Sequence, residues 1–167
     1  MNTWFRKFAT RLGLVGLLIG MLGTASVSAA PRSVEAFGVG AWPALQASVK
    51  QPTVVVFTAT WCASCPQVLE GLVAELSQRK IKASIVAVVM DVAPGEKDNT
   101  LIRNAHYKRV DRIFAFDGQA PAIRDRVDPK WRGAAPYVVL LSPNAPPRMS
   151  TGMPTDTDIS AWAVAGR

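Results

Sequence analysis

The stretch Trp61-Cys62-Ala63-Ser64-Cys65-Pro66 contains the only two cysteines of the chain, separated by two residues. An apolar run, Thr53 to Phe57, comes directly before it. Apolar residues at helical spacing follow it, namely Val68, Leu69, Leu72, Val73 and Leu76. This order predicts a buried strand that leads a Cys-x-x-Cys pair into the start of a helix. A helix start has unpaired N–H groups and the positive end of the helix dipole, and both stabilise a thiolate. The motif therefore predicts redox chemistry.

Residues 1–29 have the three parts of a secretory signal peptide. Basic residues (Arg6, Lys7 and Arg11) precede the apolar run Leu12 to Leu22, and small residues follow it as far as Ala30. We expect cleavage after Ala29, which leaves a single domain over 30–167 in the periplasm. The alternative is an uncleaved segment that anchors the protein in the inner membrane. Cleavage is favoured because the run is shorter than the ~20 residues that a membrane-spanning helix needs.

Two cysteines in an oxidising compartment can form a purely structural disulfide. A bridge across two intervening residues, however, closes a very small loop and restricts the unfolded chain little. The spacing therefore favours a chemical role for the pair over a stabilising one.

The net charge gives little reason to expect a nucleic-acid partner. The whole chain carries a formal charge of +7, and three of its basic residues lie in the signal peptide. Between Lys97 and Arg132 there are nine basic and five acidic residues. Such a basic face suits an acidic partner or a membrane surface, and a solvated surface is the simpler interpretation.

Apolar runs and turn residues divide the rest of the chain into elements. Between Ser33 and Val49, where apolar residues mix with glycine, we expect only a short helix over Trp42–Ser48. Strands are predicted at Thr53–Thr58, Ala83–Met90, Ile113–Phe116 and Tyr137–Leu141, with a short edge strand near Arg148–Thr151. Helices are predicted from near Cys62 to Arg79, from Asp98 to Tyr107, from Ala120 to Arg126, and after a cap at Thr155 or Asp156.

The run Phe57-Thr58-Ala59-Thr60-Trp61-Cys62-x-x-Cys65 resembles the Phe-Trp-Ala-x-Trp-Cys-x-x-Cys signature of the exported TlpA/ResA-like thiol–disulfide oxidoreductases, a branch of the thioredoxin superfamily. Thr58 stands where that signature has a tryptophan. Gly133-Ala134-Ala135-Pro136-Tyr137 is similar to the family's cis-proline loop, and Gly152 matches a glycine ahead of its last helix. The resemblance covers the chain from about Trp42 to the C-terminus.

The resemblance implies a thioredoxin-like three-layer α/β sandwich, in which helices flank a mixed central β-sheet. Some 45 residues separate Met90 from Pro136, and this excess matches the extra helix–strand insertion of the TlpA-like branch. Cys62 and Cys65 are then the catalytic residues and form the redox-active disulfide. We expect Cys62 to attack and a shielded Cys65 to resolve the mixed disulfide. Trp61, Ala135 and Pro136 are the expected substrate-binding residues.

Two positions depart from the family in a way that bears on mechanism. Thioredoxins bury an aspartate six residues before the first cysteine, where this chain has Val56. ResA-type relatives have a glutamate three residues after the second cysteine, where this chain has Val68. The nearest helical acid is Glu70, which we expect to face solvent. We therefore predict slow resolution by Cys65, unless water or substrate takes its proton.

A metal site is not expected, because His106 is the sole histidine and metal sites usually need three or four ligands. Pro66 after Cys65 excludes covalent haem attachment at the motif. The first functional hypothesis is an exported oxidoreductase that exchanges disulfides with protein thiols without a cofactor. A membrane electron donor is its expected redox partner, and cytochrome c maturation or another periplasmic thiol pathway its expected setting. The alternative is a non-enzymatic assembly factor or copper-handling module. The oligomeric state does not follow from the sequence.

Overall fold

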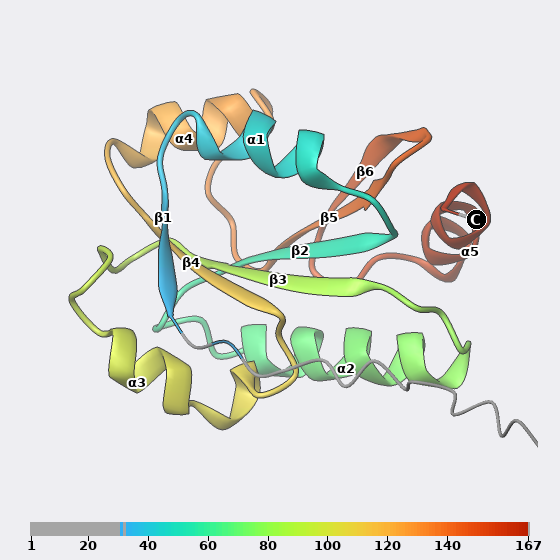
Figure 1. Ribbon diagram of the computed structural model, residues 1–167, viewed down its shortest axis with the longest axis horizontal. Helices are drawn as coiled ribbons and strands as arrows, with labels where there is room; N and C mark the ends of the chain where they lie inside the picture. The colour runs from blue at the N-terminus through green and yellow to red at the C-terminus, as the bar shows by residue number, and fades with distance from the viewer. Residues whose placement is uncertain (1–30, 32, 167) are drawn as a thin grey trace, which may run out of the picture.

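The computed structural model describes residues 31 and 33–166, in which helices cover both faces of a six-stranded sheet (Figure 1). The predicted signal peptide lies outside the described residues. The strands are β1 Val34–Phe37, β2 Thr53–Thr58, β3 Ser84–Val89, β4 Arg112–Phe116, β5 Tyr137–Ser142 and β6 Ala145–Thr151. The helices are α1 Ala41–Ser48, α2 Cys65–Gln78, α3 Asp98–Arg103, the 3₁₀ turn η1 Ala105–Tyr107, α4 Ala120–Val127 and α5 Asp156–Ala165. None of the helices described is long and apolar enough to span a bilayer.

The strand order across the sheet is β1-β4-β3-β2-β5-β6. The four strands β1, β4, β3 and β2 run parallel to one another, whereas β5 is antiparallel to β2 and β6 to β5. The sheet is therefore mixed, as predicted. All six residues of β2 are buried, which is typical of a strand covered on both faces.

The two faces of the sheet hold two separate hydrophobic clusters. We call the side covered by α2, α3, η1 and α5 the aliphatic face; its strand residues are Val54, Val56, Ile85, Ala87, Val89, Ile113, Ala115, Val138 and Leu140. The side covered by α1 and α4 is the aromatic face, which holds Phe37, Trp42, Phe57, Phe114, Phe116, Trp131 and Tyr137. This confirms the three-layer sandwich.

The predicted extra helix–strand insertion is present between β3 and α4, and its strand β4 lies between β3 and β1. The prediction of one helix over Asp98–Tyr107 is wrong. α3 ends at Arg103, because Asn104 is extended and its side chain accepts a hydrogen bond from the His106 backbone N–H (3.0 Å). Asparagine competes in this way with the helical backbone. The 3₁₀ turn η1 that follows turns Tyr107 into the aliphatic face.

The edge strands differ most from the sequence-based expectation. β1 was not expected, and it is a short edge strand of which only Phe37 is fully buried; its pattern is weak because its place depends on pairing with β4. β6 begins at Ala145 instead of Arg148 and includes both prolines that follow Ala145. An irregularity in the register against β5 lets an edge strand accommodate them.

Candidate functional site

Cys62 and Cys65 form a disulfide with a Cα–Cα distance of 5.4 Å. The helix begins at Cys65, so the prediction of a helix start near Cys62 is wrong. Cys62 lies in the preceding turn, where its N–H bonds the Ala59 carbonyl (3.1 Å) and its carbonyl accepts from the Cys65 N–H (3.3 Å). Pro66 lies in the first turn of α2, where a missing N–H costs nothing. The turn places both sulfurs at the positive end of the helix dipole.

Both cysteines are largely buried in this disulfide state, with exposed fractions of 7% for Cys62 and 3% for Cys65. They pack with Ala59 and Ala135 in a small cluster of their own. The Ser64 hydroxyl lies 3.8 Å from the Cys62 sulfur. Beside them, Trp61 is 69% exposed, whereas the other tryptophans described are buried. The assignment of Cys62 as the attacking cysteine stays a prediction.

On one side the disulfide faces the loop before β5. The Ala135–Pro136 peptide bond is cis, as the resemblance implied, and Ala135 packs against the disulfide cluster. The Pro136 carbonyl accepts a hydrogen bond from the Gly152 N–H (2.9 Å). Gly152 has a φ of 79°, a conformation that favours glycine. Trp61, Ala135 and Pro136 thus lie around the disulfide; substrate binding by them stays a prediction.

A buried network supports this loop from the aromatic face. The Trp131 ring stacks on Tyr137, with centroids 4.5 Å apart, and its Nε1 donates to the Ala134 carbonyl (2.9 Å). The Tyr137 hydroxyl donates to Asp128 at 2.5 Å. Burial, and then Asp128, raise the pKa of Tyr137, while the Tyr137 hydroxyl and the Lys130 N–H lower the pKa of Asp128. The hydrogen bonds that the stacked Trp131 and Tyr137 donate therefore hold the loop in place.

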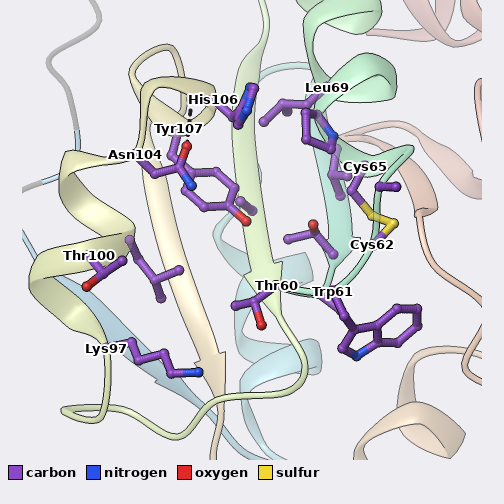
Figure 2. A pocket seen from close by; sticks show the side chains of 17 residues that line it. Thr60, Trp61, Cys62, Cys65, Leu69, Lys97, Thr100, Asn104, His106 and Tyr107 are labelled. Carbon is purple, nitrogen blue, oxygen red and sulfur yellow. Dashed lines mark hydrogen bonds between the residues drawn. A yellow bond between two sulfur atoms is a disulfide. The ribbon is translucent and has the colours of Figure 1, made fainter.

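On the other side the disulfide borders a cleft of about 690 Å³. Figure 2 shows Lys97, Thr100, Asn104 and Tyr107 on the insertion, facing Cys62 and Cys65 across it. Its lining comprises Val56, Thr58, Ala59, Thr60, Trp61, Cys62, Ala63, Cys65, Pro66, Leu69, Ala87, Lys97, Thr100, Leu101, Asn104, His106 and Tyr107. Two of its lining residues, Val56 and Ala87, are small side chains that are paired on adjacent strands.

No carboxylate lines this cleft within the described part of the chain. Val56 and Val68, at the two family acid positions, are buried and half-buried. Glu70 is 65% exposed, as expected, but its Oε1 also contacts His106 Nδ1 at 2.9 Å. Asp91 lies close by, and its carboxylate accepts from the N–H (2.9 Å) and the hydroxyl (2.5 Å) of Thr60.

Sequence reasoning did not place Thr58, His106 or Tyr107 at the site. Tyr107 is buried, which raises its pKa, and a hydrogen bond with the Thr58 side chain acts in the opposite direction. The length of the insertion was the available signal, since it showed that extra residues had to pack somewhere on the sheet. Among the residues described, no three His, Cys, Asp or Glu side chains lie close enough to hold a metal ion.

Comparison with known proteins finds solved structures that are similar to this chain. No family model matches the chain, and no curated protein matches it. A secreted Mycobacterium tuberculosis disulfide oxidoreductase homologous to E. coli DsbE is 15% identical, with a TM-score of 0.44 over 70% of this chain and 82% of that one. A Chlorobium tepidum protein described as thiol:disulfide interchange protein DsbE is 18% identical, with a TM-score of 0.48 over 73% and 84%. Oxidised thioredoxin O2 from Arabidopsis thaliana is 14% identical, with a TM-score of 0.43 over 81% and 96%.

Because these TM-scores are below 0.5, the fold is assigned from the chain's own topology. Parallel β3 and β2, joined through α2, are continued by the antiparallel strands β5 and β6 and closed by α5. The Cys-x-x-Cys disulfide stands between β2 and α2, next to a cis-proline. With these features the protein has the thioredoxin fold, with one extra helix–strand insertion.

Proposed function

We propose that this protein is a thiol–disulfide oxidoreductase that exchanges disulfides with protein substrates through Cys62 and Cys65. The observation that carries the proposal is the pair itself, a disulfide at the start of α2 that packs against Ala135 of the cis-proline loop. A bridge of this span adds little stability. A helix N-terminus, by contrast, stabilises the thiolate that exchange requires.

In the reducing direction, the Cys62 thiolate attacks a substrate disulfide, and one substrate sulfur leaves as a thiolate. A mixed disulfide then joins Cys62 to the other substrate sulfur. Cys65 loses its proton and attacks the Cys62 sulfur, which releases the substrate dithiol and forms the Cys62–Cys65 disulfide. Two electrons pass from the protein to the substrate, and no cofactor takes part. Exposed Trp61 and the Ala135–Pro136 backbone bind the substrate beside the sulfurs.

We further propose that the protein acts after export, in the periplasm. The signal-peptide pattern of residues 1–29 supports this. An oxidising compartment returns the pair to the disulfide unless electrons are supplied. A membrane electron donor is therefore proposed as the partner, with cytochrome c maturation or another thiol pathway of that compartment as the setting.

The test is insulin reduction in the presence of dithiothreitol. Cys62→Ser is expected to abolish the protein's catalysis, because it removes the thiolate that attacks the substrate disulfide. Cys65→Ser is expected to accumulate a mixed disulfide at Cys62, visible as a mass adduct that reductant removes. Gln67→Ala changes an exposed residue of α2 outside the cleft and leaves both sulfurs and Ser64 in place, so it serves as the matched control. Wild-type protein that binds one metal ion per chain and turns over no disulfide would favour the non-enzymatic alternative.

A further inference from the structure

The cleft beside the disulfide offers a solution to the missing acid. Cys65 has to lose its proton before it can attack the Cys62 sulfur, because the thiolate is the nucleophile. Both positions at which relatives place an acid hold valine here. Yet Cys65 lines a cleft of about 690 Å³, and a water molecule takes up about 30 Å³ of liquid. A chain of water molecules therefore fits between Cys65 and the opposite wall.

His106 and Glu70 form a pair at the edge of this cleft next to α2. His106 lines the cleft together with Cys65, and Figure 2 shows it between Leu69 and Tyr107. The carboxylate of Glu70 lies 2.9 Å from His106 Nδ1. It favours the tautomer that has its proton on Nδ1 and leaves Nε2 as the acceptor. The His106 side chain is 41% exposed, so it can pass a proton on to bulk solvent.

Two hydroxyl groups line the same cleft as the sulfur and the imidazole. Thr58, at the end of β2, and Tyr107, in η1, both line the cleft and interact with each other. A hydroxyl group donates one hydrogen bond and accepts others. It can therefore hold water in place without taking the proton itself. Asp91 is less suited to the role, because Thr60 already occupies both of its oxygens.

We propose that His106, oriented by Glu70, accepts the Cys65 proton through water in the cleft between α2 and the inserted α3–η1 segment. This inference rests on the proposed function. In the step, the Cys65 S–H bond breaks, its proton reaches His106 Nε2, and the electron pair left on sulfur forms the bond to Cys62. The substrate sulfur leaves as a thiolate and is protonated by solvent, while the imidazolium returns its proton to solvent. The insertion thereby supplies the base that β2 and α2 lack.

Charged side chains near His106 come from three elements. Glu70 on α2 contacts its Nδ1, and Lys97 lines the same cleft. Lys108 and Arg109 follow η1 and share a neighbouring hollow with His106 and Glu70.

The experiment separates attack from resolution with Ellman's reagent, an aromatic disulfide that releases a coloured thiolate. Reduced protein releases one equivalent when Cys62 attacks and a second when Cys65 displaces the aromatic thiolate from Cys62. We expect His106→Gln to slow the second phase about tenfold at pH 7.5 and to leave the first unchanged. That is below the range for a base in direct contact, since water intervenes.

Three further variants complete the test. Glu70→Gln is expected to slow the second phase less than His106→Gln, and Tyr107→Phe to slow it severalfold, each without an effect on the first phase. Arg103→Gln changes an exposed residue of α3 outside the cleft, so it should match the wild type. Thermal unfolding temperatures measured alongside report whether each variant is folded.

The outcomes discriminate. A second phase of wild-type rate in His106→Gln overturns the inference, and so does equal slowing of both phases. Slowing by Tyr107→Phe but not by His106→Gln also overturns it, because the proton then leaves to solvent directly. A wild-type protein that releases no thiolate at all would instead contradict the proposed function.

Discussion

The two faces of the sheet are packed differently on either side of the same central strands. On the aromatic face, Phe57 contacts five other rings, the closest being Trp131 with centroids 4.8 Å apart. On the aliphatic face, the neighbouring Val56 stands opposite Ala87, and the cleft opens above them. One face is filled by large rigid rings, and the other contains a cleft beside these small side chains.

The difference corresponds to the two flanks of the disulfide. The aromatic face continues into the Trp131–Tyr137 stack, which fixes the cis-proline loop. The aliphatic face continues into the cleft, which Tyr107 and His106 help to line. A rigid surface loses less binding free energy to ordering when a peptide docks on it, which suits the proposed role of this loop. A route for a proton needs space for water. The closely packed aromatic face and the cleft of the aliphatic face thus meet at Cys62 and Cys65.

The largest expected effect compares an acid placed on each face. Val55→Asp puts a carboxyl without a partner into the aromatic face, where Val55 is fully buried. We expect a loss of about 5 kcal/mol, from the buried polar group and the lost apolar burial. Val56→Asp lines the cleft, where water can reach it, and should lose about 2 kcal/mol less. Urea unfolding at pH 7 measures both, and equal losses would mean that the cleft stays dry.

The second comparison adds bulk on the aliphatic face, inside and outside the cleft. Ala87 and Ala115 are both fully buried there, but only Ala87 lines the cleft. Ala115→Val should destabilise the protein by about 2 kcal/mol, because close-packed neighbours have to move. Ala87→Val should change the free energy of unfolding by less than about 1 kcal/mol, since its methyl groups extend into the cleft. Denaturant midpoints check this, and a larger loss for Ala87→Val would contradict it.

A third prediction concerns the network of Trp131, Tyr137 and Asp128 on the aromatic face. Tyr137→Phe removes the hydroxyl that bonds Asp128 and keeps the ring on Trp131. A hydrogen bond to a charged group contributes about 1.5–3 kcal/mol, and Asp128 is only half-buried, so we expect a loss of about 1.5 kcal/mol. Exchange with insulin should slow as the loop loosens. Unchanged stability would show that the stacked ring alone holds the loop.

The smallest expected effect is a pH dependence of the same contact. The Tyr137 hydroxyl lowers the pKa of Asp128 in the folded protein. Its contribution is therefore complete above the unfolded value of about 3.9 and is lost as the pH falls through the lowered value. Wild-type stability between about pH 5 and 2 should fall more steeply than that of Tyr137→Phe. Parallel curves for the two proteins would show that the hydroxyl does not tune Asp128.

The sequence by itself predicted the features that depend on neighbouring residues. The apolar runs of β2, β3, β4 and β5, and the helical spacing of α2, are local patterns, so their positions followed within a few residues. The cysteine pair, the proline loop and the valines at both family acid positions are read directly from the chain. The start of α2 was misplaced by three residues, because the turn bonds of Cys62 compete with the helix.

Only the tertiary structure decided how distant segments meet. Strand β1 exists through its pairing with β4, and its own pattern is too short to predict it. The cleft results from the volumes of side chains contributed by β2, β3, α2 and the insertion together. Glu70 and His106 are 36 residues apart and meet because α3 ends early and η1 turns back towards α2. Local periodicity carries no information on such contacts, which depend on how packed elements fill space. The cysteines could therefore be identified from the sequence, whereas packing decided which residues surround them.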